Sequence, residues 1–290
     1  MSVQPAETAA VPGARAPGAA ASLHAPEPPV QLTVRSLRKR YGSEEADVLQ
    51  DAGFVLREGE SLAVIGANGS GKSTMLRCCL RLIEPDAGEI QLLAQDVMAA
   101  RDRQLRRLRQ QVGFVFQRHN LVPRLSVLSN VLHGAQARAP SPRHWFQATA
   151  PAAMRAEALA CLERVGLAEL AGRRADRLSG GQSQRVAIAR TLMQRPRLVF
   201  ADEPAASLDP TAGEDVMELF AQLMRDEGLG VLFTCHDLDH ARRYGDRVLA
   251  LKQGRVMFDR AVHEVDFDSL RHLYSPAPTG PTPKREGAHG

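Results

Sequence analysis

The sequence predicts an α/β fold in which a mainly parallel β-sheet is wrapped by helices and interrupted by an inserted helical subdomain. Two observations lead to this prediction. Short runs rich in β-branched and other apolar residues alternate with helical patterns along most of the chain, as expected where helices join parallel strands. From about Val127 to Leu178 this alternation stops, and the sequence shows helical patterning with no convincing strand.

The length and composition of the chain are those of an ordinary folded protein. Its 290 residues are compatible with one large or two small domains. The 37 basic and 33 acidic residues give a mixed surface, which does not indicate a nucleic-acid-binding face. The four cysteines form no C-x-x-C pair and have no spacing typical of a zinc site, which favours a reduced compartment. No apolar run approaches the ~18 residues that a membrane-spanning helix needs.

The two ends of the chain are rich in Ala, Pro and Gly. Residues 1–29 contain prolines that interrupt any apolar core of a signal peptide, and no basic segment precedes them, so we expect a disordered extension. Residues 266–290 are expected to form a short helix and a disordered tail. The folded domain is therefore placed at residues 30–265, with the helical subdomain at about residues 125–180.

The individual elements follow from the local pattern. The expected strands are, in order, Leu32–Val34, Phe54–Leu56, Ser61–Ile65, Val112–Phe116, Leu198–Ala201, Val231–Thr234 and Val248–Leu251. Arg101 to Gln110 predicts a basic helix with Leu105 and Leu108 on one face, which we interpret as a solvated surface helix and not as a nucleic-acid contact.

A glycine-rich loop follows the strand Ser61–Ile65. The segment "GANGSGKST" matches G-x-x-x-x-G-K-[ST] between a strand and a helix, which is the context that a phosphate-binding loop requires. Glycines let successive backbone N–H groups face phosphate oxygens, and the helix N-terminus adds a favourable dipole. Lys72 would neutralise the β and γ phosphates, and Ser73 would offer a hydroxyl to Mg²⁺. The predicted nucleotide-binding residues are Gly66, Ala67, Asn68, Gly69, Ser70, Gly71, Lys72, Ser73 and Thr74.

Two carboxylates end a later apolar strand, in "RLVFADEP". The strand Leu198–Ala201 would deliver Asp202 and Glu203 to the sheet edge where ligands bind in open α/β folds. Asp202 would then hold Mg²⁺, and Glu203 would act as the general base for, or polarise, the attacking water. The alternative is that both acids only cap a helix.

The segment "LSGGQ", Leu178–Gln182, resembles the signature sequence of ATP-binding cassette proteins, and it lies between the phosphate loop and the acidic strand in the family's order. The resemblance covers about Val30 to Tyr274. It implies a P-loop NTPase core of the ABC type with an additional N-terminal antiparallel β part. It also implies that Tyr41 stacks on adenine, that Gln117 reaches Mg²⁺ and the water, and that His236 contacts the γ-phosphate.

The resemblance further implies a head-to-tail homodimer in which ATP lies between the two chains. The residues that would contact ATP held by the other chain are Ser179, Gly180, Gly181 and Gln182. The segment "SLDP" resembles the loop that crosses the dimer interface, with Ser207, Leu208 and Asp209. His236 and His240 have the spacing of a metal pair, but no third ligand accompanies them, which disfavours zinc.

The family resemblance implies the ATP-hydrolysing subunit of a bacterial importer at the cytoplasmic face of the inner membrane. Its partners would be an integral membrane permease and, through the permease, a substrate-binding protein. The stretches "FVFQRHNLVPRLSVLSNVLHGAQ" and "ARRYGDRVLALKQGRVMFD" resemble the branch that imports phosphonates, which implies phosphonate or a related oxyanion such as phosphite as the substrate. An importer of amino acids or other small solutes is an alternative. A cassette ATPase that acts on DNA or the ribosome without a permease is a second one.

One position departs from the family's usual pattern. Ser183 stands where the family usually has a second glutamine after the signature. The shorter side chain loses contacts at the opening of the helix, but we expect the backbone donors to remain.

Overall fold

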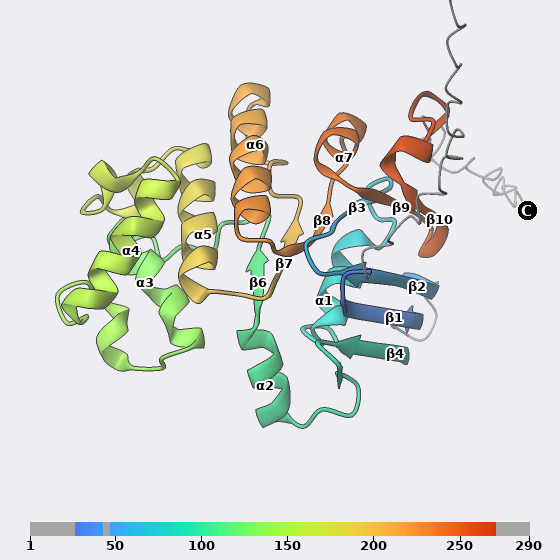
Figure 1. Ribbon diagram of the computed structural model, residues 1–290, viewed down its shortest axis with the longest axis horizontal. Helices are drawn as coiled ribbons and strands as arrows, with labels where there is room; N and C mark the ends of the chain where they lie inside the picture. The colour runs from blue at the N-terminus through green and yellow to red at the C-terminus, as the bar shows by residue number, and fades with distance from the viewer. Residues whose placement is uncertain (1–26, 43–46, 271–290) are drawn as a thin grey trace, which may run out of the picture.

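The computed structural model describes residues 27–42 and 47–270. The predicted N-terminal extension and C-terminal tail fall largely outside these residues. Two β-sheets face each other with one helix between them, and further helices gather beyond the larger sheet (Figure 1). In the described part of the chain, no helix is long and apolar enough to cross a membrane.

The smaller sheet is antiparallel. Its strands are β1 (Val30–Lys39), β2 (Leu49–Arg57), β4 (Ala87–Leu92) and β5 (Gln95–Asp96), in the order β2-β1-β4-β5. In β1, Leu32 and Val34 are buried whereas Arg35 is exposed, as expected for a sheet with one covered face. This is the antiparallel part that the family resemblance implies.

The larger sheet is mainly parallel. Its strands are β3 (Ser61–Ile65), β6 (Val112–Val115), β7 (Leu198–Asp202), β8 (Gly230–Thr234), β9 (Arg247–Lys252) and β10 (Arg255–Ala261). The order is β10-β9-β3-β8-β7-β6, and only β10 pairs antiparallel with its neighbour. Every residue of β7 and β8 is buried, which is typical of strands covered on both faces.

All seven predicted strands are present, but their extent and number differ from the prediction. The first covers ten residues and not three, and β6 ends at Val115, so Phe116 lies outside it. Three strands were missed: β4, β5 and β10. More than half of the residues in β4 are exposed or half-exposed, and none in β5 or β10 is buried. β4 and β5 contain no three adjacent apolar residues, so the pattern on which the prediction relied is missing there. β10 does carry Val256, Met257 and Phe258 in a row, so the prediction overlooked a short apolar run.

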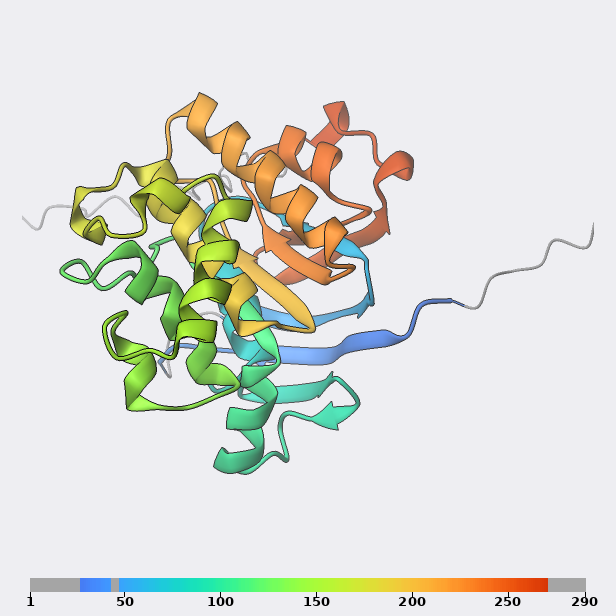
Figure 2. The same cartoon turned by 60° about the vertical axis from the view of Figure 1, so that its left-hand side comes forward.

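The helices are α1 (Lys72–Cys79), α2 (Asp102–Gln110), α3 (Val127–Leu132), α4 (Ala152–Arg164), α5 (Gly180–Gln194), α6 (Pro210–Asp226) and α7 (Leu238–Tyr244). Short 3₁₀ turns occur at His133–Ala137, Pro142–Trp145, Ala168–Leu170, Ala175–Arg177 and Val262–Glu264. Between β6 and β7 the described chain forms helices and turns with a single isolated bridge, Ser126 to Arg174. Figure 2 shows α3 and α4 from a second side, still gathered beside α5.

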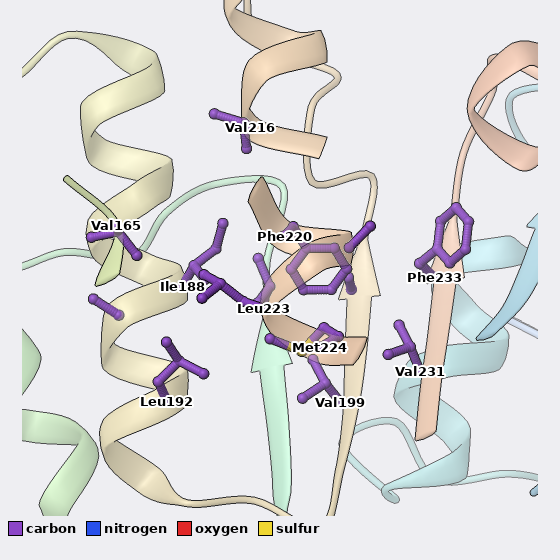
Figure 3. Packing of buried hydrophobic residues seen from close by; sticks show 14 of the residues in the cluster. Val165, Ile188, Leu192, Val199, Val216, Phe220, Leu223, Met224, Val231 and Phe233 are labelled. Atoms are coloured by element: carbon purple, nitrogen blue, oxygen red, sulfur yellow. The ribbon is translucent and has the colours of Figure 1, made fainter. Parts of the chain in front are cut away.

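Two hydrophobic clusters fix the larger sheet, one on each face. On one face α1 lies between the two sheets, where Met75 and Leu76 are fully buried. On the other face Phe220 of α6 packs with Ile188 of α5 and Val199 of β7 (Figure 3). Full burial of a side chain the size of Phe contributes roughly 1.5–3 kcal/mol. This packing holds the carboxyl ends of β7 and β8 in place beside the loop that follows β3.

Candidate functional site

The phosphate loop joins β3 to α1 and needs glycine at several positions. Gly66, Gly69 and Gly71 have φ angles of 150°, 79° and 106°, which L side chains rarely adopt. A Cβ atom on Gly66 would lie 2.2 Å from the Leu251 carbonyl oxygen, and one on Gly71 would lie 2.7 Å from that of Val48. Gly71 has no side chain to cap α1, so the first N–H groups of the helix stay available to a ligand.

A cleft of about 520 Å³ opens beside this loop. The cleft has the size of an ordinary small-molecule site. The residues that line it are Val48, Asn68, Gly69, Gly71, Lys72, Ser73, Thr74, Gln117 and Glu203. The structure therefore brings Gln117 and Glu203, which follow different strands, to the loop on which the prediction places the phosphates.

Lys72 is almost fully buried, with 4% of its surface exposed. Its Nζ atom donates to the carbonyl oxygens of Gly66 at 2.8 Å and Ala67 at 3.4 Å, and it lies 3.5 Å from Glu203 Oε1. Burying an ammonium group is costly unless partners compensate it. The carbonyls and one carboxylate supply that compensation here, and phosphate oxygens at the cleft would supply more.

Asp202 ends β7 and is 1% exposed. Its Oδ1 atom accepts hydrogen bonds from Ser73 Oγ at 2.7 Å and Thr234 Oγ1 at 3.1 Å. Its Oδ2 atom accepts one from Arg77 Nη2 at 3.1 Å. The hydroxyl of Ser73 and the carboxylate of Asp202 are oxygen ligands of the kind that Mg²⁺ prefers, so this pair fits a magnesium ion.

Glu203 adopts an unusual backbone conformation. Its φ angle is +47°, in the left-handed region that non-glycine residues seldom occupy. Its N–H donates to Thr234 Oγ1 at 2.9 Å, which fixes the turn after β7. As a result Glu203 lines the phosphate-loop cleft and also a neighbouring cleft of about 330 Å³ that contains His236 and Asp209.

His236 is exposed just after β8 and lines that neighbouring cleft, not the one at the phosphate loop. His240 makes a separate contact, because its Nε2 atom lies 3.0 Å from Glu214 Oε2. Across residues 27–42 and 47–270 no group of three or more His, Cys, Asp or Glu side chains could hold a metal ion. Cys235, between Thr234 and His236, is buried, and burial raises the pKa of its thiol, which therefore stays protonated at neutral pH.

The signature segment opens α5 with a capping box. Ser179 Oγ accepts from the Gln182 N–H at 3.2 Å, and Gln182 Oε1 accepts from the Ser179 N–H at 3.1 Å. A Cβ atom on Gly180 would lie 2.9 Å from Leu208 Cδ2. The signature thus lies against the predicted interface loop, Ser207–Asp209, and it does not line the phosphate-loop cleft of its own chain.

Tyr41 lies near the site but does not line the cleft. The residue is 41% exposed, and Lys39 Nζ lies 5.5 Å from the centroid of its ring. Val48, which does line the cleft, donates its N–H to the Lys39 carbonyl oxygen at 2.7 Å. Tyr41 therefore belongs to the connection between β1 and β2 that borders the phosphate loop.

Sequence reasoning missed two residues that contact Asp202, namely Arg77 and Thr234. Arg77 comes four residues after Ser73 on α1, and this spacing on one helix face could have indicated it. Thr234 lies directly opposite Asp202 across the β7–β8 ladder. No local pattern reveals that pairing, because it depends on which strands become neighbours.

The sequence is similar to those of ABC transporter proteins. The ABC transporter family profile matches residues 49–206. A phosphonates import ATP-binding protein from Nocardia farcinica is 46% identical over 248 residues, which cover 86% of this chain and 91% of the relative. A phosphate-import ATP-binding protein from Mycolicibacterium smegmatis is 45% identical over 256 residues, which cover 88% of this chain and 96% of the relative.

Solved structures show the same fold. The dimeric structure of MJ0796, described as a bacterial ABC transporter cassette, matches with a TM-score of 0.69 and 34% identity over 80% of this chain and 98% of that one. A dimeric post-hydrolysis state of the same cassette, bound to ADP and phosphate, matches with a TM-score of 0.68 and 33% identity over the same shares. The phosphate loop, the acidic strand end, the signature and these matches agree, and the chain belongs to the ABC transporter family.

Proposed function

We propose that this chain is the ATP-hydrolysing subunit of a bacterial ABC importer that takes up phosphonate or a related phosphorus oxyanion. One observation carries the ATPase part of the proposal. Lys72, Ser73 and Glu203 line a single cleft with Gln117, and Asp202 contacts Ser73 from the strand end. Phosphoryl transfer to water uses a cation, oxygen ligands for a metal ion and an acid that positions the water. Lys72 is the cation here, Ser73 and Asp202 are the oxygen ligands, and Glu203 is the acid.

In this mechanism the nine loop residues, Gly66 to Thr74, bind the phosphates, and Tyr41 stacks on the adenine. Ser73, Asp202 and Gln117 would hold Mg²⁺, which when bound neutralises charge on the β and γ phosphates. Glu203 orients the attacking water and accepts its proton, because it is an acid at the cleft with a fixed backbone. His236 lines the neighbouring cleft, which shares Glu203 with the phosphate-loop cleft, and it would contact the γ-phosphate from there.

We further propose that two copies assemble head to tail around ATP. The signature would then contact ATP held by the partner chain through Ser179, Gly180, Gly181 and Gln182. The neighbouring loop, with Ser207, Leu208 and Asp209, would lie at the interface between the two chains. Two observations support this arrangement: the signature adjoins that loop, and it does not line its own chain's cleft. Both MJ0796 structures are described as dimeric.

The proposed partners are an integral membrane permease and, indirectly, a substrate-binding protein, with the chain at the cytoplasmic face of the inner membrane. Within the proposed domain, residues 30–265, the helical subdomain at about residues 125–180 would receive the permease. Trp145 and Phe146 support this placement, because they are 54% and 48% exposed although they are large and apolar. Exposed aromatic side chains of this kind often mark protein interfaces.

The substrate proposal rests on the relatives. Several are named as phosphonate importers and one as a phosphate importer, at 41–46% identity. The cleft itself binds nucleotide in this proposal and does not select the transported solute.

Growth of a deletion strain that lacks other phosphorus uptake systems tests the substrate. We expect no growth on methylphosphonate as the sole phosphorus source, and restored growth when the wild-type chain is supplied but not when Lys72→Ala is supplied. Parallel cultures on phosphite and phosphate separate the related oxyanions. Normal growth of the deletion strain on all three sources would overturn the substrate proposal and leave the ATPase proposal standing.

A further inference from the structure

Both carboxylate oxygens of Asp202 are held by residues to which the proposed ATPase mechanism gives no role. Arg77 donates to Oδ2 at 3.1 Å, and Thr234 donates to Oδ1 at 3.1 Å. Asp202 is almost fully buried, so its charge needs partners in the protein. The question is whether these partners only compensate the buried charge or also aim the carboxylate.

Arg77 and Ser73 approach Asp202 from the same helix. They are four residues apart on α1, so their side chains share one face. Ser73 Oγ donates to Oδ1 at 2.7 Å while Arg77 binds the other oxygen. The terminal torsion of an aspartate is broad when nothing restrains it. Two contacts from one rigid helix, one to each oxygen, fix the plane of this carboxylate.

Thr234 approaches from the neighbouring strand and is fully buried. It pairs with Asp202 in the register of β7 and β8. Its hydroxyl donates to Asp202 Oδ1 and accepts from the Glu203 N–H at 2.9 Å. One hydroxyl therefore joins the carboxylate of Asp202 to the strained backbone of Glu203.

We propose that Arg77 and Thr234 are positioning residues that hold Asp202 with Oδ1 toward Ser73, where the two side chains would hold a divalent cation together. The inference rests on the proposed role of Ser73 and Asp202 as magnesium ligands. Neither positioning residue needs to touch the cation, because each acts through a hydrogen bond to its ligand. Loss of such an outer partner typically lowers metal affinity about 10- to 100-fold.

Arg77 also has an effect that opposes metal binding. Its positive charge near the site repels a divalent cation. If repulsion dominated, removing the guanidinium would tighten metal binding; if positioning dominates, removing it weakens metal binding. A measurement of metal affinity on the purified chain therefore distinguishes repulsion from positioning, because the two change the affinity in opposite directions.

The experiment titrates Mn²⁺ into the full chain with saturating ADP and measures free Mn²⁺ by electron paramagnetic resonance. We expect Arg77→Ala and Thr234→Val each to weaken Mn²⁺ binding about tenfold or more. ADP affinity measured in EDTA should stay unchanged, because neither residue lines the phosphate-loop cleft. Thr234→Ser keeps the hydroxyl and should restore most of the affinity, which a purely space-filling role for Thr234 would not explain.

Two controls make the outcomes distinguishable. Arg35→Ala removes an arginine from an exposed ion pair with Glu89, 3.6 Å long and away from the cleft, and should leave Mn²⁺ binding unchanged. Asp202→Asn tests the premise: unchanged Mn²⁺ affinity in this variant would contradict the proposed metal role of Asp202. Suppose that Asp202→Asn does weaken Mn²⁺ binding. The positioning inference alone is then overturned if Arg77→Ala and a normally folded Thr234→Val bind Mn²⁺ as wild type does. It is also overturned if Arg77→Ala binds Mn²⁺ more tightly than wild type does.

Discussion

At the scale of single residues, the site depends on backbone conformations that few side chains permit. Gly66 and Gly71 lie so close to neighbouring carbonyl oxygens that a Cβ atom would clash with them. Glu203 is a non-glycine residue held at positive φ by its hydrogen bond to Thr234. Strain of this kind persists only where the surroundings impose it, and it is frequent at functional sites.

Gly180 at the start of α5 gives the first prediction at this scale. Gly180→Asp should fold and bind ATP normally as a monomer, because an acid at a helix N-terminus is favourable and the nearest obstacle is the flexible end of Leu208. In the dimer its carboxylate would oppose the γ-phosphate, and two like charges 4 Å apart repel by about 1–4 kcal/mol at effective dielectric constants between those of water and a protein surface. A repulsion of that size corresponds to a change of about 5- to 1,000-fold, so we expect ATPase activity to be lower by at least about fivefold.

Gly172→Asp is the matched control, since no atom lies within 4 Å of a Cβ built at Gly172. Steady-state ATPase assays and nucleotide binding on both variants check the prediction. Equal ATPase rates in wild type and Gly180→Asp would show that the signature never meets ATP.

At the scale of elements, the turn Pro142–Trp145 and the residues after it form a fixed platform between α3 and α4. Gln147 donates its N–H to Ser129 Oγ at 3.1 Å, and its side-chain oxygen accepts from Ser126 Oγ at 3.1 Å. His133 Nε2 lies 3.1 Å from the Trp145 carbonyl oxygen. The backbone is thus held at Trp145 and Gln147 by α3 and its caps, while the two aromatic side chains stay exposed, which suits a preorganised docking surface.

Replacing both aromatic residues of this platform with alanine tests its proposed role. The double variant Trp145→Ala, Phe146→Ala should change the free energy of unfolding by less than about 1 kcal/mol, because both side chains are exposed. A few residues of an interface, tryptophan prominent among them, each cost about 2 kcal/mol or more in binding when truncated. We therefore expect much less of the chain in the membrane fraction of cells.

The control for the platform is Met257→Ala, which removes a side chain that is 55% exposed on β10. It should leave the membrane-associated fraction as in wild type. Thermal unfolding and membrane fractionation of all variants check both parts. An unchanged membrane fraction in the double variant would contradict a docking role for the platform.

At the scale of the whole molecule, the fold divides the proposed nucleotide site between two places. The phosphate loop, Asp202 and Glu203 meet at the carboxyl ends of β3 and β7. The signature opens α5 beside the interface loop, outside that cleft. In the proposed head-to-tail dimer, a single chain would present two incomplete halves, and a ligand that binds only the closed pair would shift the equilibrium toward the dimer.

Glu203→Gln removes the proposed general base while the rest of the site stays in place. The amide keeps the shape of the side chain but cannot accept the proton of the attacking water, so ATP hydrolysis should fall about 10²- to 10⁴-fold. ATP would then persist, and size-exclusion chromatography with light scattering should show a stable dimer in ATP. Glu227→Gln, at an exposed ion pair with Arg164, should behave as wild type does. Normal turnover by Glu203→Gln would rule out the role assigned to this residue.

The α/β class, the seven apolar strands, the phosphate loop, the acidic strand end and the family could be predicted from the chain alone, because each of them lies in a contiguous stretch of residues. The other features of the site became visible only in the fold. It placed Gln117 and Glu203 at one cleft and His236 at the next, and it revealed the half-exposed strands β4, β5 and β10. It also brought Thr234 opposite Asp202. These features depend on which strands become neighbours in the sheet, and residues 32 positions apart carry no local signal of that contact.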